Sequence, residues 1–202
     1  MRVERYFAFE GNVNDSGSKH LDAVVLDSAG GSVVPGVYPD DSPSAVGSGK
    51  SISFDGSGLR VDIPDEDGAP QPTAFTISLW VKFTSLELPL LPTSVIVRTP
   101  SSGGEGGAWS HQIRLNRFGQ FQCWTYDQGN GSNPNVVSTT VAQPNIWYHV
   151  VVSGKNGGLV RMYVKGVEEG AAAPVNTLWQ GGHLYSLGTG SGGGYSPAPL
   201  QI

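Results

Sequence analysis

Cysteine, basic clusters and helical periodicity are all scarce in this chain of 202 residues. The single cysteine, Cys123, excludes an internal disulfide, and its strand-like surroundings predict a buried, unreactive thiol. The net charge is −5 and the 12 Lys and Arg are scattered, which argues against nucleic acid as a partner. The apolar run that opens the chain at residues 1–11 is too short for a signal peptide or a membrane span.

Glycine and proline are abundant, with 29 and 14 residues, whereas charged residues make up only 14% of the chain. This turn-rich composition excludes a helical bundle or coiled coil. Short alternating runs of apolar and polar residues recur between turn signals and predict antiparallel strands in one domain spanning residues 1–202. The predicted strands are 3–9, 22–26, 50–54, 59–63, 75–83, 94–98, 110–116, 119–126, 135–141, 146–153, 159–165 and 183–188. Tight turns are predicted at 116–119, 154–158 and 164–167.

Four motifs occur in a fixed order: FAFEGNVNDSG at 7–17, GSGKSISFDGSGLRVDIPD at 47–65, FTISLWVK at 75–82 and IWYHVVVSGKNGGLVRMYVKGV at 146–167. In this order they resemble laminin-G-like domains of the concanavalin A-like lectin and glucanase group. The resemblance implies an all-β fold, a two-sheet antiparallel jelly-roll sandwich. It also implies a glycine-turn hairpin within residues 54–65. The family usually closes with an acidic and aliphatic strand after the glycine loop, and here either residues 199–202 form an abbreviated closing strand or the native protein continues.

Patterns that would carry catalysis are absent from the sequence. Some relatives with this sandwich are glycosidases or lyases, and glycoside hydrolysis needs two carboxylates about 5–10 Å apart. The glucanase pattern Glu-x-Asp-x-x-Glu does not occur, and the adjacent Glu168 and Glu169 would point to opposite faces of a strand. No Gly-x-Ser-x-Gly elbow occurs either. His149 lies beside valines in a predicted strand, where a largely buried structural role is expected, so the chain is not expected to be an enzyme.

The strands at 110–116 and 119–126 present a candidate binding face. Alternation sends Ile113, Leu115, Phe121 and Cys123 to the core, and it places the ligand-binding candidates Gln112, Arg114, Trp124 and Tyr126 on the opposite face. A sugar ring stacks on an aromatic side chain, and amides and guanidinium groups bind its hydroxyls. The alternative is that a loop covers this face and that Trp124 belongs to a second core layer.

Three further tryptophans are considered. Trp109 and Trp179 lie beside glycine-rich loops and are alternative anchors for a sugar. Trp80 points away from the core layer of its strand, so it either lines the concave face or lies under a covering loop.

Calcium is the expected cofactor, in a structural role. It prefers six to eight oxygen ligands, and the loop EGNVNDSG at 10–17 supplies carboxylate and amide oxygens. Asp15 and Asn12 are the predicted ligands, and the alternative is that Asp15 forms an Asx turn.

The sequence therefore favours a non-catalytic binding module for carbohydrate or a glycosylated surface, at an extracellular or cell-surface location. An alternative is a structural or assembly protein, such as an adhesion protein or a decoration protein on a virion surface, whose partners are other proteins of a larger assembly. A glycosidase or polysaccharide lyase ranks third. A glycan site needs exposed Trp or Tyr beside amides, whereas an assembly protein needs an apolar, symmetric contact patch.

Overall fold

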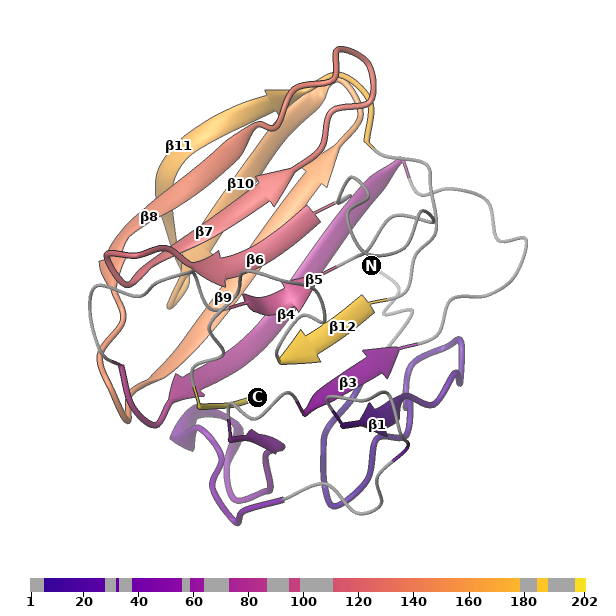
Figure 1. Cartoon of the computed structure of the whole chain (residues 1–202), viewed down its shortest axis with the longest axis vertical. Coiled ribbons are helices and arrows are strands. Elements are labelled where there is room, and N and C mark those ends of the chain that lie inside the picture. Colours follow the sequence, from indigo (N-terminus) through magenta and orange to yellow (C-terminus); the bar gives the residue numbers. More distant parts are fainter. Residues whose placement is uncertain are drawn as a thin grey trace.

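The computed structural model describes residues 6–27, 32, 38–55, 59–63, 73–86, 95–98, 111–178, 185–188 and 199–202. These residues form two antiparallel β-sheets, which pack against each other as a sandwich (Figure 1). Within the described ranges the helical structure is the single 3₁₀ turn η1 (Ser44–Val46). No helix among them is long and apolar enough to cross a membrane.

The seven-stranded sheet extends from β8 at the upper left of Figure 1 to β1 at the lower right. Its strands are, in spatial order, β1 (Val24–Leu26), β3 (Arg60–Ile63), β12 (Tyr185–Gly188), β5 (Val95–Arg98), β6 (His111–Leu115), β7 (Gln120–Thr125) and β8 (Asn135–Val141). The strands of the six-stranded sheet are β11 (Val167–Val175), β10 (Gly158–Val164), β9 (Trp147–Lys155), β4 (Ala74–Phe83), β13 (Leu200–Gln201) and β2 (Ser53–Phe54). The all-β, two-sheet antiparallel sandwich predicted from the sequence is confirmed.

Every predicted strand except the first has a counterpart, and one strand, β11, was not predicted. The prediction of a strand at 3–9 is wrong over its described part, because residues 6–9 contain only an isolated bridge from Phe7 to Asp15. β11 was missed because its sequence, VEEGAAAPV, combines glutamates, a glycine and a proline in place of regular alternation. The abbreviated closing strand exists as β13.

The predicted hairpin within residues 54–65 is wrong. β2 pairs with β13 in the six-stranded sheet, whereas β3 pairs with β1 and β12 in the seven-stranded sheet. Phe54 and Val61 are both fully buried, so the two strands face the same core from opposite sides. A glycine turn between two short strands is compatible with a hairpin and with a crossing between sheets, and here the chain crosses.

Aromatic rings join the two sheets at the centre of the core. The ring of Phe121 on β7 lies 6.5 Å from that of Phe83 on β4 and 5.2 Å from that of Tyr148 on β9. The predicted inward residues of β6 and β7 are all fully buried. Burial of each such side chain contributes about 1.5–3 kcal/mol. Burial also raises the pKa of the Cys123 thiol to about 12, which makes this cysteine inert at neutral pH.

One carboxylate ties the edge strands of the two sheets together. Glu169 on β11 accepts hydrogen bonds from the Thr140 backbone N–H at 2.7 Å, the Thr140 hydroxyl at 2.7 Å and the Thr139 hydroxyl at 3.0 Å. Burial acts to raise the pKa of Glu169, but these donors outweigh it and hold the pKa below its usual value. The next residue, Gly170, has φ of +79°, and a Cβ built there would lie 2.0 Å from the Val137 carbonyl oxygen.

Replacing Gly170 with alanine is therefore expected to destabilise the protein by about 3–5 kcal/mol, because positive φ and a backbone collision act together. Chemical denaturation would measure the change. The matched control is Gly166→Ala, where φ is +82° but no atom lies within 4 Å of the added Cβ. This control should cost only about 1–2 kcal/mol. Equal losses in the two variants would show that the approach of β11 to β8 does not limit stability.

Candidate functional site

A row of outward-facing positions crosses the seven-stranded sheet. Asp62 lies between the buried Val61 and Ile63, and Trp124 lies between the buried Cys123 and Thr125, so the row lies on the outer face. In register from β3 to β8, the row consists of Asp62, Ser186, Arg98, Gln112, Trp124 and Asn135. The pairing of Gln112 with Trp124 brings two of the predicted site residues side by side, as the hairpin between β6 and β7 requires.

The guanidinium group of Arg114 is held on the ring of Trp124. Its Cζ lies 3.9 Å from the ring centroid, within the range of a cation–π contact. Arg114 Nε donates to Gln122 Oε1 at 3.1 Å, and Arg114 Nη1 donates to Gln112 Oε1 at 3.4 Å. Gln122 Nε2 in turn donates to Asn135 Oδ1 at 3.3 Å. We refer to Gln112, Arg114, Gln122 and Trp124 as the Trp124 face.

Burial differs sharply among these side chains. Trp124 is 36% exposed, so it does not form a second core layer, whereas Arg114 is 8% exposed and Gln112 only 1%. Gln112 Nε2 has no hydrogen-bond partner among the residues that the structure describes. A buried donor without a partner costs about 1–3 kcal/mol, and native proteins contain few of them. The Trp124 face therefore combines an exposed indole, a fixed cation and an unsatisfied donor.

Tyr126, the fourth predicted residue, lies just beyond β7 and is half-buried. Its neighbour Asp127 is buried and anchors the loop. The Asp127 carboxylate accepts from the backbone N–H of Gly129 at 2.9 Å, Asn176 at 2.9 Å and Thr177 at 3.0 Å. Burial acts to raise the pKa of Asp127, but these donors prevail and hold the pKa below its usual value.

Asp127→Asn is expected to lower the free energy of unfolding at pH 7 by about 2–4 kcal/mol, because an amide leaves some of these N–H donors unpaired. The folded pKa lies below the unfolded one, so the carboxylate stabilises the fold above its unfolded pKa. This contribution is lost as the pH falls through the folded pKa. The difference in the free energy of unfolding between the wild type and Asp127→Asn should shrink below about pH 4.

Denaturant titrations between pH 3 and 7 measure this difference. The control is Glu168→Gln, which breaks an exposed ion pair with Arg161. A pH-independent gap would contradict this assignment.

Trp109 and Trp179, the alternative anchors for a sugar, lie outside the described residues.

Asp15, the first predicted calcium ligand, is 5% exposed. Its carboxylate accepts from the backbone N–H of Tyr6 at 2.8 Å, Gly17 at 2.7 Å and Leu21 at 3.1 Å, and the bond to Gly17 forms an Asx turn. Asn12 Oδ1 accepts from the Asn14 N–H at 3.0 Å. Among the described residues no three His, Cys, Asp or Glu side chains cluster as a metal site. Calcium at Asp15 and Asn12 stays a prediction.

Trp80 points outward from the six-stranded sheet, as its strand alternation predicts. Its ring stacks on that of His149 with centroids 4.9 Å apart. His149 is half-buried, and its Nε2 has a polar partner in Ser78 Oγ at 2.9 Å. Beside this pair, Lys82 Nζ lies 5.1 Å above the ring of Trp147.

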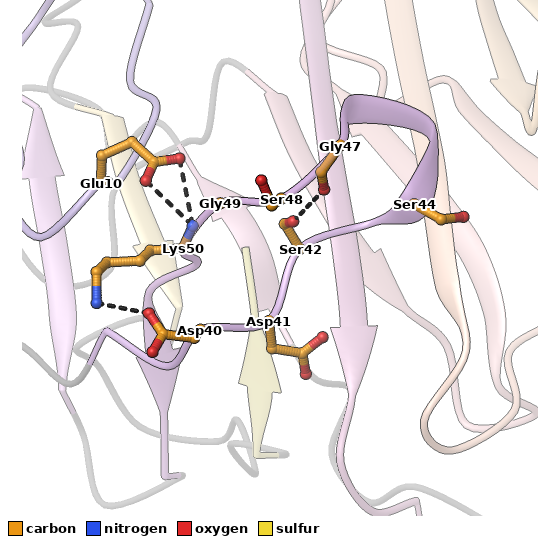
Figure 2. Close-up of a pocket in the computed structure, with 9 residues that line it drawn as sticks. All are labelled: Glu10, Asp40, Asp41, Ser42, Ser44, Gly47, Ser48, Gly49 and Lys50. Carbon is orange, nitrogen blue, oxygen red and sulfur yellow. Dashed lines mark hydrogen bonds and ion pairs between the residues drawn. The ribbon is translucent and has the colours of Figure 1, made fainter.

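Sequence reasoning missed an open hollow of about 610 Å³, lined mostly by polar residues, at the edge of the six-stranded sheet. It is lined by Glu10 and by residues 40–42, 44 and 47–50 (Figure 2). Glu10 accepts from the Lys50 backbone N–H at 3.2 Å, and Lys50 Nζ pairs with Asp40 at 2.7 Å. The only sequence signal was the run DDSPS at 40–44, which reads as an ordinary turn. We call this feature the Asp41 hollow.

Residues 55–199 match the family Laminin_G_3, the concanavalin A-like lectin/glucanases superfamily. The match covers most of the chain, and this protein belongs to that family. No curated protein matched the sequence.

Solved structures share the fold at low identity. One is domain 4 of AbnA, a GH43 extracellular arabinanase from Geobacillus stearothermophilus, in complex with arabinotriose, with TM-score 0.65, 17% identity and coverage of 99% of this chain and 91% of that one. The binding domain of Paraclostridial Mosquitocidal Protein 1 matches with TM-score 0.71 and 12% identity, over 99% of this chain and 47% of that one. The botulinum neurotoxin serotype D ligand-binding domain, in complex with N-acetylneuraminic acid, matches with TM-score 0.65 and 10% identity, over 98% and 46%. This chain spans about half the length of the two toxin chains.

Proposed function

We propose that this protein is a non-catalytic carbohydrate-binding module that binds a glycan on the Trp124 face. The observation that carries the proposal is the indole of Trp124, exposed on the sheet surface and held from one side by Arg114. The exposed part of the ring is available for stacking against the C–H face of a sugar. Similar domains from an arabinanase and a neurotoxin were solved with arabinotriose and N-acetylneuraminic acid, which supports the ligand class.

The same contacts explain how a sheet surface would select a ligand. Arg114 and Gln112 are buried and joined to each other, so they are set in position before a ligand arrives. Binding then costs little side-chain entropy. A shallow site of this kind has a dissociation constant of about micromolar to millimolar, and repeated contacts on a polymer raise the retention.

The chemistry of the outer row supports binding in place of catalysis. Its carboxylate, Asp62, accepts from the Ser186 hydroxyl at 2.6 Å and from Arg60 Nε at 3.1 Å. Glycoside hydrolysis needs one carboxylate as an acid and a second as a base or nucleophile, on opposite sides of the bond. An extracellular location is proposed from the extracellular arabinanase and the toxin binding domains that share the fold.

Trp124→Ala should weaken binding about tenfold or more in a glycan array and in titration calorimetry, because the stacking platform is lost. Phe118→Ala is the matched control, since Phe118 is 57% exposed and also carries an arginine, Arg117, at 4.7 Å from its ring. This control should bind like the wild type. Binding retained in Trp124→Ala would place the site elsewhere. An array without any bound glycan would favour an assembly role.

Gln112→Met separates function from stability on the same face. The change removes the Nε2 donor, which has no partner among the described residues, but it also removes the Oε1 that accepts from Arg114, so these opposing effects should leave the free energy of unfolding within about 1 kcal/mol of the wild type. Glycan affinity should fall, because Arg114 loses one of the two amides that position it. Lower stability with unchanged affinity would contradict a binding role for Gln112. Parallel calorimetry and denaturation measure the two effects.

A further inference from the structure

Beyond the Trp124 face, the Asp41 hollow has features of a second binding site on the opposite sheet. Asp41 connects the hollow to the outer face of that sheet, because its Oδ1 accepts from Trp147 Nε1 at 3.3 Å and its Oδ2 pairs with Lys82. Lys82 and Trp147 are paired across β4 and β9, and Trp80 and His149 are the next outward pair. A half-buried aromatic surface thus adjoins a polar concavity.

The groups that line the hollow can both donate and accept hydrogen bonds. The carboxylates of Glu10 and Asp40 lie on either side of Lys50, and the Asp41 carboxylate points away from Lys50 (Figure 2). The Asp40 side chain is 86% exposed, and the serines at 44 and 48 add exposed hydroxyl groups. Carboxylates accept sugar hydroxyls strongly, because hydrogen bonds to charged groups are about twice as strong as neutral ones.

The charge of the hollow restricts what it can bind. The carboxylates of Glu10, Asp40 and Asp41 line the hollow together with the ammonium group of Lys50, and Lys82 pairs with Asp41 beside it, so three negative charges meet two positive ones. The hydrogen bond from Lys82 lowers the pKa of Asp41 against the effect of burial, and Trp147 adds to this effect, so Asp41 is ionised at neutral pH. A net negative hollow repels acidic sugars and accepts neutral ones.

Two buried side-chain oxygens next to these elements have no hydrogen-bond partner among the described residues. Gln201 is paired with Lys82 in the register and is 8% exposed, and its Oε1 has no hydrogen-bond partner among the described residues. Ser51 Oγ, in a residue 2% exposed that directly follows the hollow, also lacks a described partner. These two atoms mark the region as one where polar groups remain to be satisfied.

We infer that the Asp41 hollow, whose Asp41 accepts a hydrogen bond from the neighbouring Trp147, is a second carbohydrate site, specific for neutral, hydroxyl-rich glycans. The inference rests on the proposed function for its ligand class. The two sites lie on the outer faces of opposite sheets, so one molecule binds two glycan segments at once. On a polysaccharide this arrangement gives avidity or cross-linking that a single face does not provide.

The test maps binding by amide chemical shifts in ¹H–¹⁵N spectra of the whole chain. Arabinotriose, cellotriose and lactose serve as neutral probes, N-acetylneuraminic acid as an acidic probe and calcium chloride as a cation probe. At least one neutral probe should shift the amide signals of residues 47–50 in the wild type and equally in Trp124→Ala, and N-acetylneuraminic acid should not. Asp41→Asn and Asp40→Asn should each lower the neutral-sugar affinity in the hollow about fivefold to tenfold. Glu168→Gln is the control and should leave this affinity unchanged, because Glu168 lies at the far edge of the same sheet.

The outcomes separate the two sites. Shifts in the hollow that persist in Trp124→Ala support the second site, and they do so even when the Trp124 face itself proves inactive. Neutral-sugar shifts restricted to the Trp124 face overturn the second site and leave the proposed function standing. The second site is also overturned if no neutral sugar shifts the amide signals of residues 47–50. Shifts there with calcium and not with sugar identify a cation site and overturn the inference. Because Asp40 is highly exposed, Asp40→Asn keeps the test valid if Asp41→Asn does not fold.

Discussion

The packing of Phe121 between the two sheets is the contact on which the rest of the molecule depends. Its ring lies against Phe83 and Tyr148 of the facing sheet, and this contact determines which residues of β7, β4 and β9 point inward. Because side chains alternate along a strand, this contact also determines which residues point outward. These are Trp124 on the seven-stranded sheet and Lys82 and Trp147 on the six-stranded sheet. A slip of one residue in any of these strands would exchange core and surface, so both candidate sites depend on this register.

Carboxylates, two of them buried and one half-buried, perform the same structural task in three places. Asp15, Asp127 and Glu169 accept backbone N–H groups in loops and at sheet edges, where no neighbouring strand supplies a carbonyl. Each is satisfied by several donors, which accounts for the lowered pKa values of Asp127 and Glu169. These acids therefore hold loops and close the edge of the sandwich.

The two outer faces differ in charge and in shape. The Trp124 face carries the guanidinium group of Arg114 on a sheet surface, whereas the Asp41 hollow is concave and rich in carboxylates. Two proposed sites of different character on opposite sides would suit an extended, repetitive ligand, because each site alone would bind weakly and both together would retain the polymer.

Local signals in the sequence were enough to determine most of the strands, the tight turns, the buried Cys123 and the shared outer face of Gln112 and Trp124. The last follows because a short hairpin fixes the register of its two strands. Other features had no local signal. The chain between β2 and β3 crosses from one sheet to the other, although the same glycine turn is compatible with a hairpin. The Asp41 hollow joins Glu10 to Lys50 and Asp41 to Trp147, residues 40 and 106 positions apart. Only the tertiary structure decided these contacts, because alternation tells which face a residue occupies and not which distant residue lies beside it.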